Sequence, residues 1–351
     1  MSDLIGKALE VLRAGGLVAI PTETVYGLAA DASNPQAVEK IFSTKGRPSG
    51  HPLIVHIAQP PSSDRLSDDA WRELLLPWVR DISPAALALA KAFWPGPLTI
   101  ILPKAKNVLS QVTGGQDTVG IRCPKHPVAQ DLLVHFGGGL AAPSANRFGR
   151  ISPTTAEHVR DEFVDQPIMV LDGGSCEVGI ESTIVDLSRW DQLGYVILRP
   201  GAISSEMIQA ALLGAQVEMP HQISQQLDIN QPRVSGSLSA HYAPKTKMFL
   251  YPSGQLASVL PSALKLKNKL AWLHFSSNSS ADAEYLKTEH TNIVEKILPT
   301  QSDELARQLY ALLRQLDQEN YDGIVFENLP TDPTWDAVRD RLGRAVVGSG
   351  S

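Results

Sequence analysis

The stretch from residue 17 to residue 27 reads Leu17-Val18-Ala19-Ile20-Pro21-Thr22-Glu23-Thr24-Val25-Tyr26-Gly27. Its first four residues are apolar and predict a buried strand, which Pro21 ends. Apolar residues at helical spacing from Leu4 to Leu12 predict a helix before this strand, and Gly15-Gly16 ends that helix. The polar loop therefore follows the carboxyl end of a strand, which is where open α/β sheets bind their ligands.

Strands and helices continue to alternate up to about residue 213. Further strands are expected at Leu53–Ile57, Leu98–Leu102, Leu140–Ala142, Ile168–Leu171, Ser182–Leu187 and Tyr195–Arg199. Further helices are expected from Asn34 to Ile41, from Ser83 to Trp94, from His126 to Phe136 and from Met207 to Leu213. This order predicts an α/β domain over residues 1–213 with a mixed, twisted sheet rather than a simple βαβ repeat.

The pattern changes after residue 213. Residues 214–245 are rich in Gln, Ser and Pro without a sustained period, so we expect a linker. A structureless stretch of this length is usually either disordered or functional, and in the second case it would be an active-site lid. Residues 246–351 predict a small Rossmann-like parallel α/β domain. Its strands are expected at Met248–Tyr251, Leu270–Leu273 and Gly323–Phe326, and its helices at Gln255–Leu266, Asp303–Leu316 and Ala337–Leu342.

Length and composition agree with two globular domains. The chain has 351 residues, of which 43% are hydrophobic and 19% charged, and its formal net charge is -6. This acidic total excludes non-specific nucleic-acid binding by a global positive field. The start of the chain lacks a continuous apolar run, so we expect neither a signal peptide nor a membrane span and place the protein in the cytoplasm. Cys123 and Cys176 are expected to be reduced thiols, because no second pair completes a zinc site.

The segment Lys45-Gly46-Arg47-Pro48 supplies two cations one residue apart, just beyond the helix that starts at Asn34. Arg47 can grip a phosphate bidentately and Lys45 can act as a point charge. A solvated basic turn after a helix is the ordinary alternative. Arg122 and Arg199 each end a strand-like run, which favours a phosphate site. The chain lacks a P-loop and a dinucleotide fingerprint, so side chains would have to hold the phosphates of a nucleotide.

Short hydroxyl and amide side chains gather at the ends of the expected segments. Ser144 and Asn146 lie between a buried strand and Arg147, and they suit recognition of a small zwitterion and a nucleotide. Most such groups cap helices or turns, and the segment Ser152–Thr155 is expected to begin a helix. The full set is Thr22, Thr24, Thr118, Ser144, Asn146, Ser152, Ser182 and Thr183.

Several carboxylates are further candidates for chemistry. Each could hold magnesium or act as a base, but a carboxylate near arginines is more often a structural partner, so none is assigned as a base. They are Glu23, Asp31, Asp172, Glu181 and Asp186. Because the sequence has no HExxH, paired CxxC or GxSxG, we expect neither a protein metal site nor covalent catalysis.

The linker ends in His241-Tyr242-Ala243-Pro244-Lys245. The simpler interpretation is a domain-entry turn that an aromatic ring anchors. The alternative is that the linker folds over a pocket of the first domain, where His241 and Tyr242 would help to exclude water.

Several of these segments, in this order, resemble the Sua5/YrdC family of threonylcarbamoyl-AMP synthases. They are Pro21–Leu28, Lys45–Pro48, Trp94–Thr99, Arg122–Pro127, Pro143–Asn146, Glu181–Asp186 and Arg199–Gly201. This resemblance spans residues 1 to about 210. His241–Pro244 and the α/β domain that follows resemble the long, two-domain Sua5 form.

The resemblance implies that the chain converts L-threonine, bicarbonate and ATP into threonylcarbamoyl-AMP and pyrophosphate, the first step of the tRNA t6A modification. The amine of threonine would form a carbamate that attacks the α-phosphate in line, so positioning and cations can supply most of the catalysis. Magnesium would accompany ATP. The product would pass to the tRNA threonylcarbamoyl transferase machinery.

The resemblance also implies roles for individual residues. Lys45 and Arg47 would be catalytic. The residues that match ATP-binding positions are Lys45, Arg47, Thr118, Ser144, Asn146, Ser152 and Arg199, and those that match threonine-binding positions are Thr22, His56, Arg122 and Ser182. His51 departs from the Asn that is common before Pro-Leu, and Val234–Ser237 departs from a Ser-Pro-Gly turn.

Two other functions stay open. A double-stranded RNA-binding or ribosome-maturation factor could use Arg147, Arg150 and Arg160 as a basic patch, although the acidic total weakens this hypothesis. A carbamoyl-adenylate enzyme that uses another amine is the other alternative. A comparison of threonine with serine would separate the two enzymes.

Overall fold

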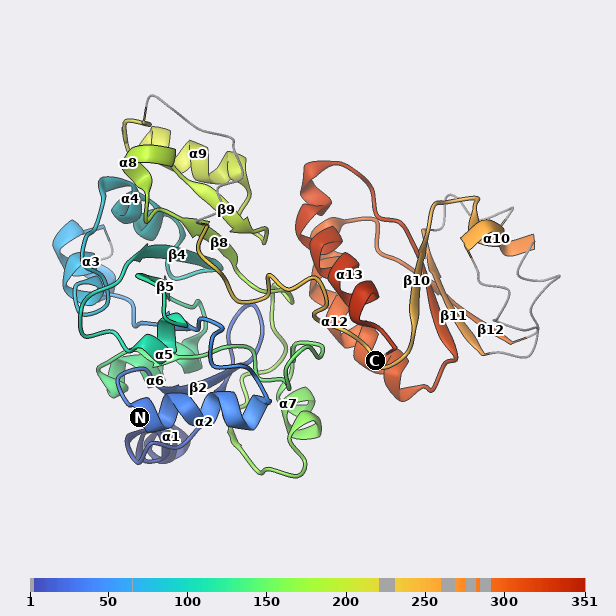
Figure 1. Ribbon diagram of the computed structural model, residues 1–351, viewed down its shortest axis with the longest axis horizontal. Coiled ribbons are helices and arrows are strands. Elements are labelled where there is room, and N and C mark those ends of the chain that lie inside the picture. The colour runs from blue at the N-terminus through green and yellow to red at the C-terminus, as the bar shows by residue number, and fades with distance from the viewer. Residues whose placement is uncertain are drawn as a thin grey trace. The chain divides into compact units, whose positions relative to one another are not determined.

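The computed structural model describes residues 3–64, 66–220, 231–259, 269–275, 282–284 and 292–350. The chain forms two compact units (Figure 1). The first contains Met1–Phe148 and Ser152–Ser237, and the second contains Gly149–Ile151 and Leu238–Ser351. None of the helices in the described ranges is long and apolar enough to cross a membrane.

The first unit is built on one large mixed sheet. Its strands are β1 (Val18–Ile20), β2 (Gly27–Asp31), β3 (Ile54–His56), β4 (Leu98–Pro103), β5 (Thr118–Arg122), β6 (Leu140–Ala141), β7 (Met169–Val170), β8 (Thr183–Asp186) and β9 (Val196–Arg199). Their order in the sheet is β7-β1-β2-β6-β3-β5-β4-β8-β9. The pairs β1·β7, β3·β5 and β4·β8 are parallel, and the other pairs are antiparallel. The predicted mixed sheet is confirmed.

Helices flank this sheet. They are α1 (Asp3–Arg13), α2 (Pro35–Lys45), α3 (Asp68–Leu75), α4 (Pro84–Phe93), α5 (Ser110–Thr113), α6 (Pro127–Phe136), α7 (Ala156–Glu162), α8 (Trp190–Leu193) and α9 (Ser205–Gly214), with a 3-10 turn, η1, at Ser62–Asp64. The large apolar core lies between the sheet and helices such as α2 and α4, whose buried residues include Ile41 and Leu89. A separate apolar cluster joins α1 to α6 through Leu9 and Leu133.

The ends of α2 place the first basic motif. Asn34 caps the helix, because its side-chain oxygen accepts from the backbone nitrogens of Gln36 and Ala37. The helix was predicted to end near Ile41 with Lys45 beyond it, but it continues to Lys45. Gly46 then ends it in the left-handed region, with φ 62°. Lys45 therefore starts from rigid helix rather than from a loop.

The other differences from the predicted elements are local. β2 escaped the prediction because its sequence, Gly-Leu-Ala-Ala-Asp, has no β-branched or aromatic residue, although four of its five residues are buried. The segment Ser152–Thr155 was expected to begin a helix, and it does so at its last residue. Thr155 caps α7 by accepting from the backbone nitrogen of His158.

The second unit is a parallel four-stranded sheet of order β10-β13-β11-β12. Its elements are β10 (Met248–Tyr251), α10 (Leu256–Val259), β11 (Leu270–His274), β12 (Ile293–Ile297), α12 (Ser302–Gln318), β13 (Gly323–Glu327), η2 (Pro333–Trp335) and α13 (Asp336–Gly348). Figure 1 shows α12 and α13 together on one side of the sheet. The predicted parallel domain is confirmed. The part of the expected Gln255–Leu266 helix beyond residue 259 lies outside the described residues.

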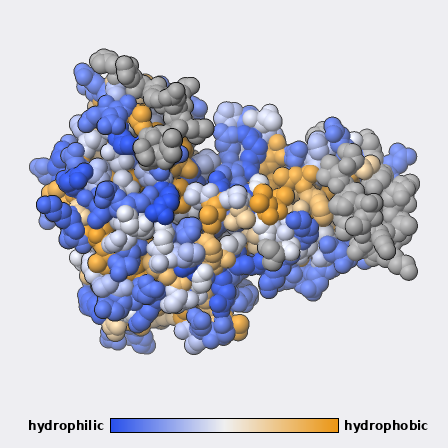
Figure 2. Space-filling model, viewed as in Figure 1, coloured by the Kyte–Doolittle hydropathy of each residue, from blue (hydrophilic) through white to orange (hydrophobic). Residues whose placement is uncertain are grey.

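The coloured surface in Figure 2 is mainly polar. On the face drawn there, hydrophilic residues cover most of the coloured surface, and hydrophobic residues form smaller patches among them. Polar residues that are buried are therefore the more informative ones.

Candidate functional site

Strand register brings three polar residues together in the middle of the large sheet. His56 on β3 pairs with Arg122 on β5, and Thr99 on β4 pairs with the same Arg122 from the other side. All three are buried. Arg122 is thus the centre of a polar row that crosses three adjacent strands.

Glu23, from the loop after β1, neutralises the charge of Arg122. Its Oε1 lies 2.8 Å from Nη2 of Arg122, and both side chains are at most 5% exposed. The second carboxylate oxygen, Oε2, accepts from the backbone nitrogen of Lys125 at 2.9 Å. The backbone carbonyl of Glu23 accepts from the nitrogen of Val178. The loop at residues 21–26 is therefore fastened to the end of β5.

The neighbouring Thr22 and His56 are uncharged. The Thr22 hydroxyl donates to the carbonyl of Val25 at 2.6 Å and accepts from the backbone nitrogens of Thr24 and Val25. Burial, and then the charge of Arg122, lower the pKa of His56 to about 3. The imidazole is therefore neutral at physiological pH, which leaves Arg122 as the cation of this row.

Ser182 connects this row to Arg199. Its hydroxyl lies 2.8 Å from that of Thr99 and accepts from Nη2 of Arg199 at 3.1 Å. Nε of Arg199 donates to the carbonyl of Ser182 at 3.0 Å. Gly201 allows this approach, because a Cβ at that position would overlap the backbone nitrogen of Thr183. Arg122 and Arg199 therefore belong to one connected set of side chains.

The second group forms around Lys45. Its ammonium nitrogen donates to the carbonyls of Ser144 at 2.5 Å and of Asn146. The Asn146 side chain is buried and donates to the carbonyl of Arg147 at 2.7 Å. Burial, with the adjacent charge of Arg47, lowers the pKa of Lys45 well below its usual value, whereas Glu162 opposes this shift. The two motifs singled out in the sequence, a hundred residues apart, are thus in direct contact.

Arg47 and Arg199 converge on Ser235. Nη1 of Arg199 donates to the Ser235 carbonyl at 2.8 Å, and Nη2 of Arg47 donates to the Ser235 hydroxyl at 3.4 Å and to the Pro52 carbonyl at 3.0 Å. Both guanidinium groups are buried. Two cations that are far apart in sequence therefore grip the same oxygen-bearing residue from the stretch expected to be a linker.

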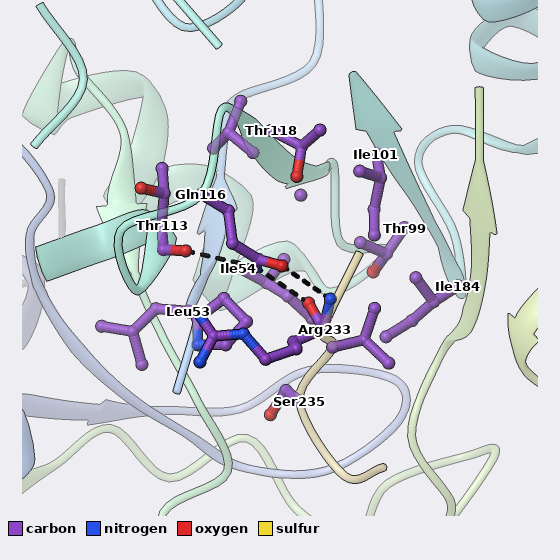
Figure 3. Close-up of a pocket in the computed structure, with 14 residues that line it drawn as sticks. Leu53, Ile54, Thr99, Ile101, Thr113, Gln116, Thr118, Ile184, Arg233 and Ser235 are labelled. Atoms are coloured by element: carbon purple, nitrogen blue, oxygen red, sulfur yellow. Dashed lines mark hydrogen bonds between the residues drawn. The ribbon is translucent and has the colours of Figure 1, made fainter. Parts of the chain in front are cut away.

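The same stretch closes a pocket of the first unit. Arg233, Val234 and Ser235 form one wall, and Thr99, Thr118 and Ile184 lie among the residues of the others. Figure 3 shows Gln116 reaching to the backbone of Arg233, where it accepts from the nitrogen at 2.6 Å and donates to the carbonyl at 3.1 Å. Only about 20 Å³ of cavity remains, which is room for a water molecule rather than for a nucleotide.

Three predicted residues lie apart from these contacts. The hydroxyl of Ser152 is buried and donates to Oε1 of Glu181 at 2.6 Å. Tyr242 is in the second unit, where its ring stacks on Tyr310 at 5.5 Å and lies under the guanidinium of Arg341. His241 packs against Tyr242, with ring centroids 4.1 Å apart, and its backbone nitrogen donates to the carbonyl of Arg344. The contacts of His241 and Tyr242 are those of an anchored turn in the second unit.

His51, which replaces a common Asn, packs its ring against Phe148 with centroids 5.4 Å apart. Burial, and the charges of Arg47 and Arg233, lower its pKa. A neutral ring beside these arginines adds no further positive charge to the group around Lys45.

Three contributors to the site were not predicted from the sequence. Thr99 was part of a quoted motif without a role, and its signal is a buried hydroxyl between the apolar Leu98 and Ile100. Ser235 and Gln116 had no local signal, because their contacts join residues that are distant in sequence. Within the described residues, no three His, Cys, Asp or Glu side chains are placed to hold a metal ion.

Comparison with known proteins identifies the family. The family model described as telomere recombination (Sua5, YciO, YrdC) matches residues 10–201, and the model described as threonylcarbamoyl-AMP synthase, C-terminal domain, matches residues 203–346. The geometry defines an α/β protein in which buried cationic side chains lie at strand ends. The chain belongs to the Sua5/YrdC family, in the two-domain Sua5 form.

Full-length relatives support this assignment. The threonylcarbamoyl-AMP synthase of Pyrococcus abyssi is 35% identical, with 95% of this chain and 91% of the relative covered. That of Bacillus subtilis is 35% identical, with 98% and 93% covered. The crystal structure of P. abyssi Sua5 complexed with L-threonine is similar with a TM-score of 0.77 and 33% identity, over 98% of this chain and 94% of that one.

Proposed function

We propose that this protein is a threonylcarbamoyl-AMP synthase, a nucleotidyltransferase that converts L-threonine, bicarbonate and ATP into threonylcarbamoyl-AMP, pyrophosphate and water. The names of relatives that match over nearly the whole chain support this reaction, as does the threonine in the P. abyssi structure. In the structure itself, the convergence of Arg47 and Arg199 on Ser235 carries the proposal. Two buried guanidinium groups that donate to the hydroxyl and carbonyl oxygens of one residue could bind phosphate oxygens in the same way.

The two connected groups of residues divide between the two larger substrates. ATP would bind on the side of Lys45, Arg47, Thr118, Ser144, Asn146 and Arg199. Ser152 lies apart from these contacts and donates to Glu181, so its proposed role in ATP binding rests on the family resemblance alone. Threonine would bind on the side of Thr22, His56, Arg122 and Ser182, with its carboxylate on Arg122. Ser182 bonds to Arg199 and so joins the two sides.

This arrangement suits attack by a carbamate on the α-phosphate. The carbamate oxygen forms a bond to phosphorus while the bond to the leaving pyrophosphate breaks. Both nucleophile and electrophile are anionic, so fixed cations such as Arg47 and Arg199 would lower their repulsion. Because these groups are buried and prearranged, little reorganisation would be needed during the step.

Magnesium would accompany ATP. The described residues offer no three-ligand group for it. Phosphate oxygens and water, the usual ligands of this ion, would therefore supply most of its coordination.

The test of the function is pyrophosphate release from ATP and bicarbonate, with and without threonine. We expect release that depends on threonine, and much weaker release with serine. Folded protein that releases no pyrophosphate with threonine would contradict the proposal. Faster release with another amino acid would assign the chain to a different carbamoyl-adenylate reaction.

The linker is proposed to act as an active-site lid. Val234 is buried against Ile101 and Ile184, and this contact holds Arg233 and Ser235 across the pocket. Since the remaining cavity is too small for a nucleotide, the lid would shift when ATP enters and reseat over it.

A substitution of Val234 tests the lid. Val234→Asp should lower turnover by about 10-fold or more, because a buried charge unseats the segment. Leu238→Asp is the matched control, since Leu238 is 37% exposed on the same stretch, and it should keep the wild-type rate. Equal rates for the two variants would show that the linker is passive.

The product would pass to the tRNA threonylcarbamoyl transferase machinery in the cytoplasm.

RNA binding as the main function has less support. The three arginines considered for a basic patch are each engaged by a carboxylate: Arg147 by Asp165 at 2.6 Å, Arg160 by Asp172 at 3.4 Å and Arg150 by Asp317 at 3.4 Å. Phosphate contacts would have to displace these ion pairs.

A further inference from the structure

The ion pair between Glu23 and Arg122 leaves hydrogen-bonding capacity unused. Its two charged atoms are 2.8 Å apart, but they are not aligned as a hydrogen bond. Among the described residues, Nε and Nη2 of Arg122 and Oε1 of Glu23 have no hydrogen-bond partner. Buried polar atoms without partners are costly, and they often mark a place that a ligand completes.

The unused atoms of Arg122 lie on one edge of its guanidinium group. Nε and Nη2 together form the fork that receives both oxygens of a carboxylate. The side chain starts from the end of β5 and is flanked by His56 and Thr99 on the adjacent strands. This edge therefore suits a single planar anion.

The unused oxygen of Glu23 is a fixed anion beside that fork. Its partner oxygen, Oε2, is held by the backbone nitrogen of Lys125, and the backbone carbonyl of Glu23 is held by Val178. Oε1 is thus kept in place without Arg122. A cation that arrived together with a carboxylate would meet Oε1.

The titratable side chains His56 and Cys176 near the Glu23–Arg122 pair are neutral, so the pair supplies the charges of the subsite. Burial and the charge of Arg122 keep His56 neutral, with a pKa of about 3. Burial, and then the charge of Glu23, raise the pKa of the Cys176 thiol to about 12, so it is also neutral. A zwitterion can complete the pair without adding net charge to a buried place, whereas an anion or a cation alone would add one.

We propose that Glu23 is a specificity-determining residue that binds the α-ammonium group of the amino-acid substrate at Oε1, while the substrate carboxylate occupies the Nε–Nη2 edge of Arg122. The pair would recognise a free α-amino acid before its amine is carbamoylated. This inference rests on the proposed function, because it concerns the same amino-acid subsite.

The experiment compares two ligands that differ only in the ammonium group. L-Threonine and 3-hydroxybutyrate share the carboxylate and the hydroxyl, and their binding to the full chain is measured by calorimetry. Wild-type protein should bind threonine about 10- to 100-fold more tightly, which corresponds to one hydrogen bond to a charged group. Equal affinities would overturn the inference without any variant being needed.

The variant Glu23→Gln then separates recognition from simple support of Arg122. It keeps an acceptor for Lys125 but loses the charge. Threonine affinity should fall about 10- to 100-fold while 3-hydroxybutyrate affinity changes less than about 3-fold. If Glu23 only positions Arg122, both affinities fall by the same factor, and this result would overturn the inference.

Asp186→Asn is the matched control. Asp186 is a buried carboxylate of the same sheet, paired with Arg189, and its amide variant should leave both affinities at the wild-type values. Wild-type protein that binds no threonine would contradict the proposed function as well as this inference. Threonine binding with a proportional loss of both ligands in Glu23→Gln would contradict this inference alone.

Discussion

The buried arginines of the two units differ in the partners that they contact. In the described part of the first unit, Arg47, Arg122 and Arg199 are buried, and in that of the second unit Arg341 is. Arg341 contacts its sequence neighbour Asp340 at 2.6 Å and lies over the ring of Tyr242. The three arginines of the first unit instead meet loops and the linker stretch, through Glu23, Pro52 and Ser235.

The position of the residue that contacts a buried arginine therefore indicates whether this charge stabilises the fold or belongs to a functional site. Desolvation of a guanidinium group is costly in either unit. A partner on the same helix offsets this cost within the fold, and such a charge stabilises structure. An arginine that contacts loop residues at strand ends can release these contacts and bind a ligand in their place. This is typical of a functional site.

The largest expected effect is on activity, in the first unit. Arg47→Ala should reduce threonine-dependent pyrophosphate release by at least about 100-fold, because it removes a cation from developing phosphate charge. The fold should persist, since the backbone contacts of residues 42–47 remain. Turnover and circular dichroism are the measurements. A normal rate would remove Arg47 from the site and weaken the contrast between the units.

The second effect is on stability, in the second unit. Arg341→Met should lower the unfolding free energy of this unit by about 2 kcal/mol, because Asp340 keeps Arg344 as a partner and is not left unpaired. Calorimetric unfolding measures this loss. Pyrophosphate release below the transition should stay within about 2-fold of wild type. Lost turnover with unchanged melting would mean that Arg341 also serves catalysis.

The third effect is smallest at neutral pH and appears only in acid. His56 has a pKa of about 3 in the folded chain, whereas an unfolded histidine titrates near about 6.5. Between these values the unfolded chain binds a proton that the folded chain does not, so stability falls as the pH falls, by at most about 1.4 kcal/mol per pH unit. His56→Gln should flatten this slope between about pH 6 and 4 in urea unfolding. Parallel slopes for the two proteins would contradict the buried, neutral imidazole.

Much of the fold was readable from local patterns. Asn34 and Ser83 begin helices as predicted, because a short polar cap followed by proline is a local signal. The alanine-rich β2 was not recognised, since its burial comes from neighbouring strands rather than from its own residues. Lys45 was placed beyond its helix, because helix ends are set by cap geometry more than by composition.

The site was only partly predictable. Cations at strand ends could be named from sequence, but their partners could not. Thr99 lies beside Arg122 only because β4 pairs with β5 in one particular register, and Ser235 meets Arg47 across 188 residues of chain. Such contacts depend on tertiary packing, which single-sequence patterns do not contain.

Gly201 carries a consequence for the evolution of this chain. Any larger residue there would push its Cβ into the backbone nitrogen of Thr183 and displace the strand end that presents Ser182 to Arg199. In a saturation-mutagenesis library selected for activity, position 201 should therefore be nearly as depleted of substitutions as position 199. A residue without a side chain would be under the same purifying selection as the arginine beside it.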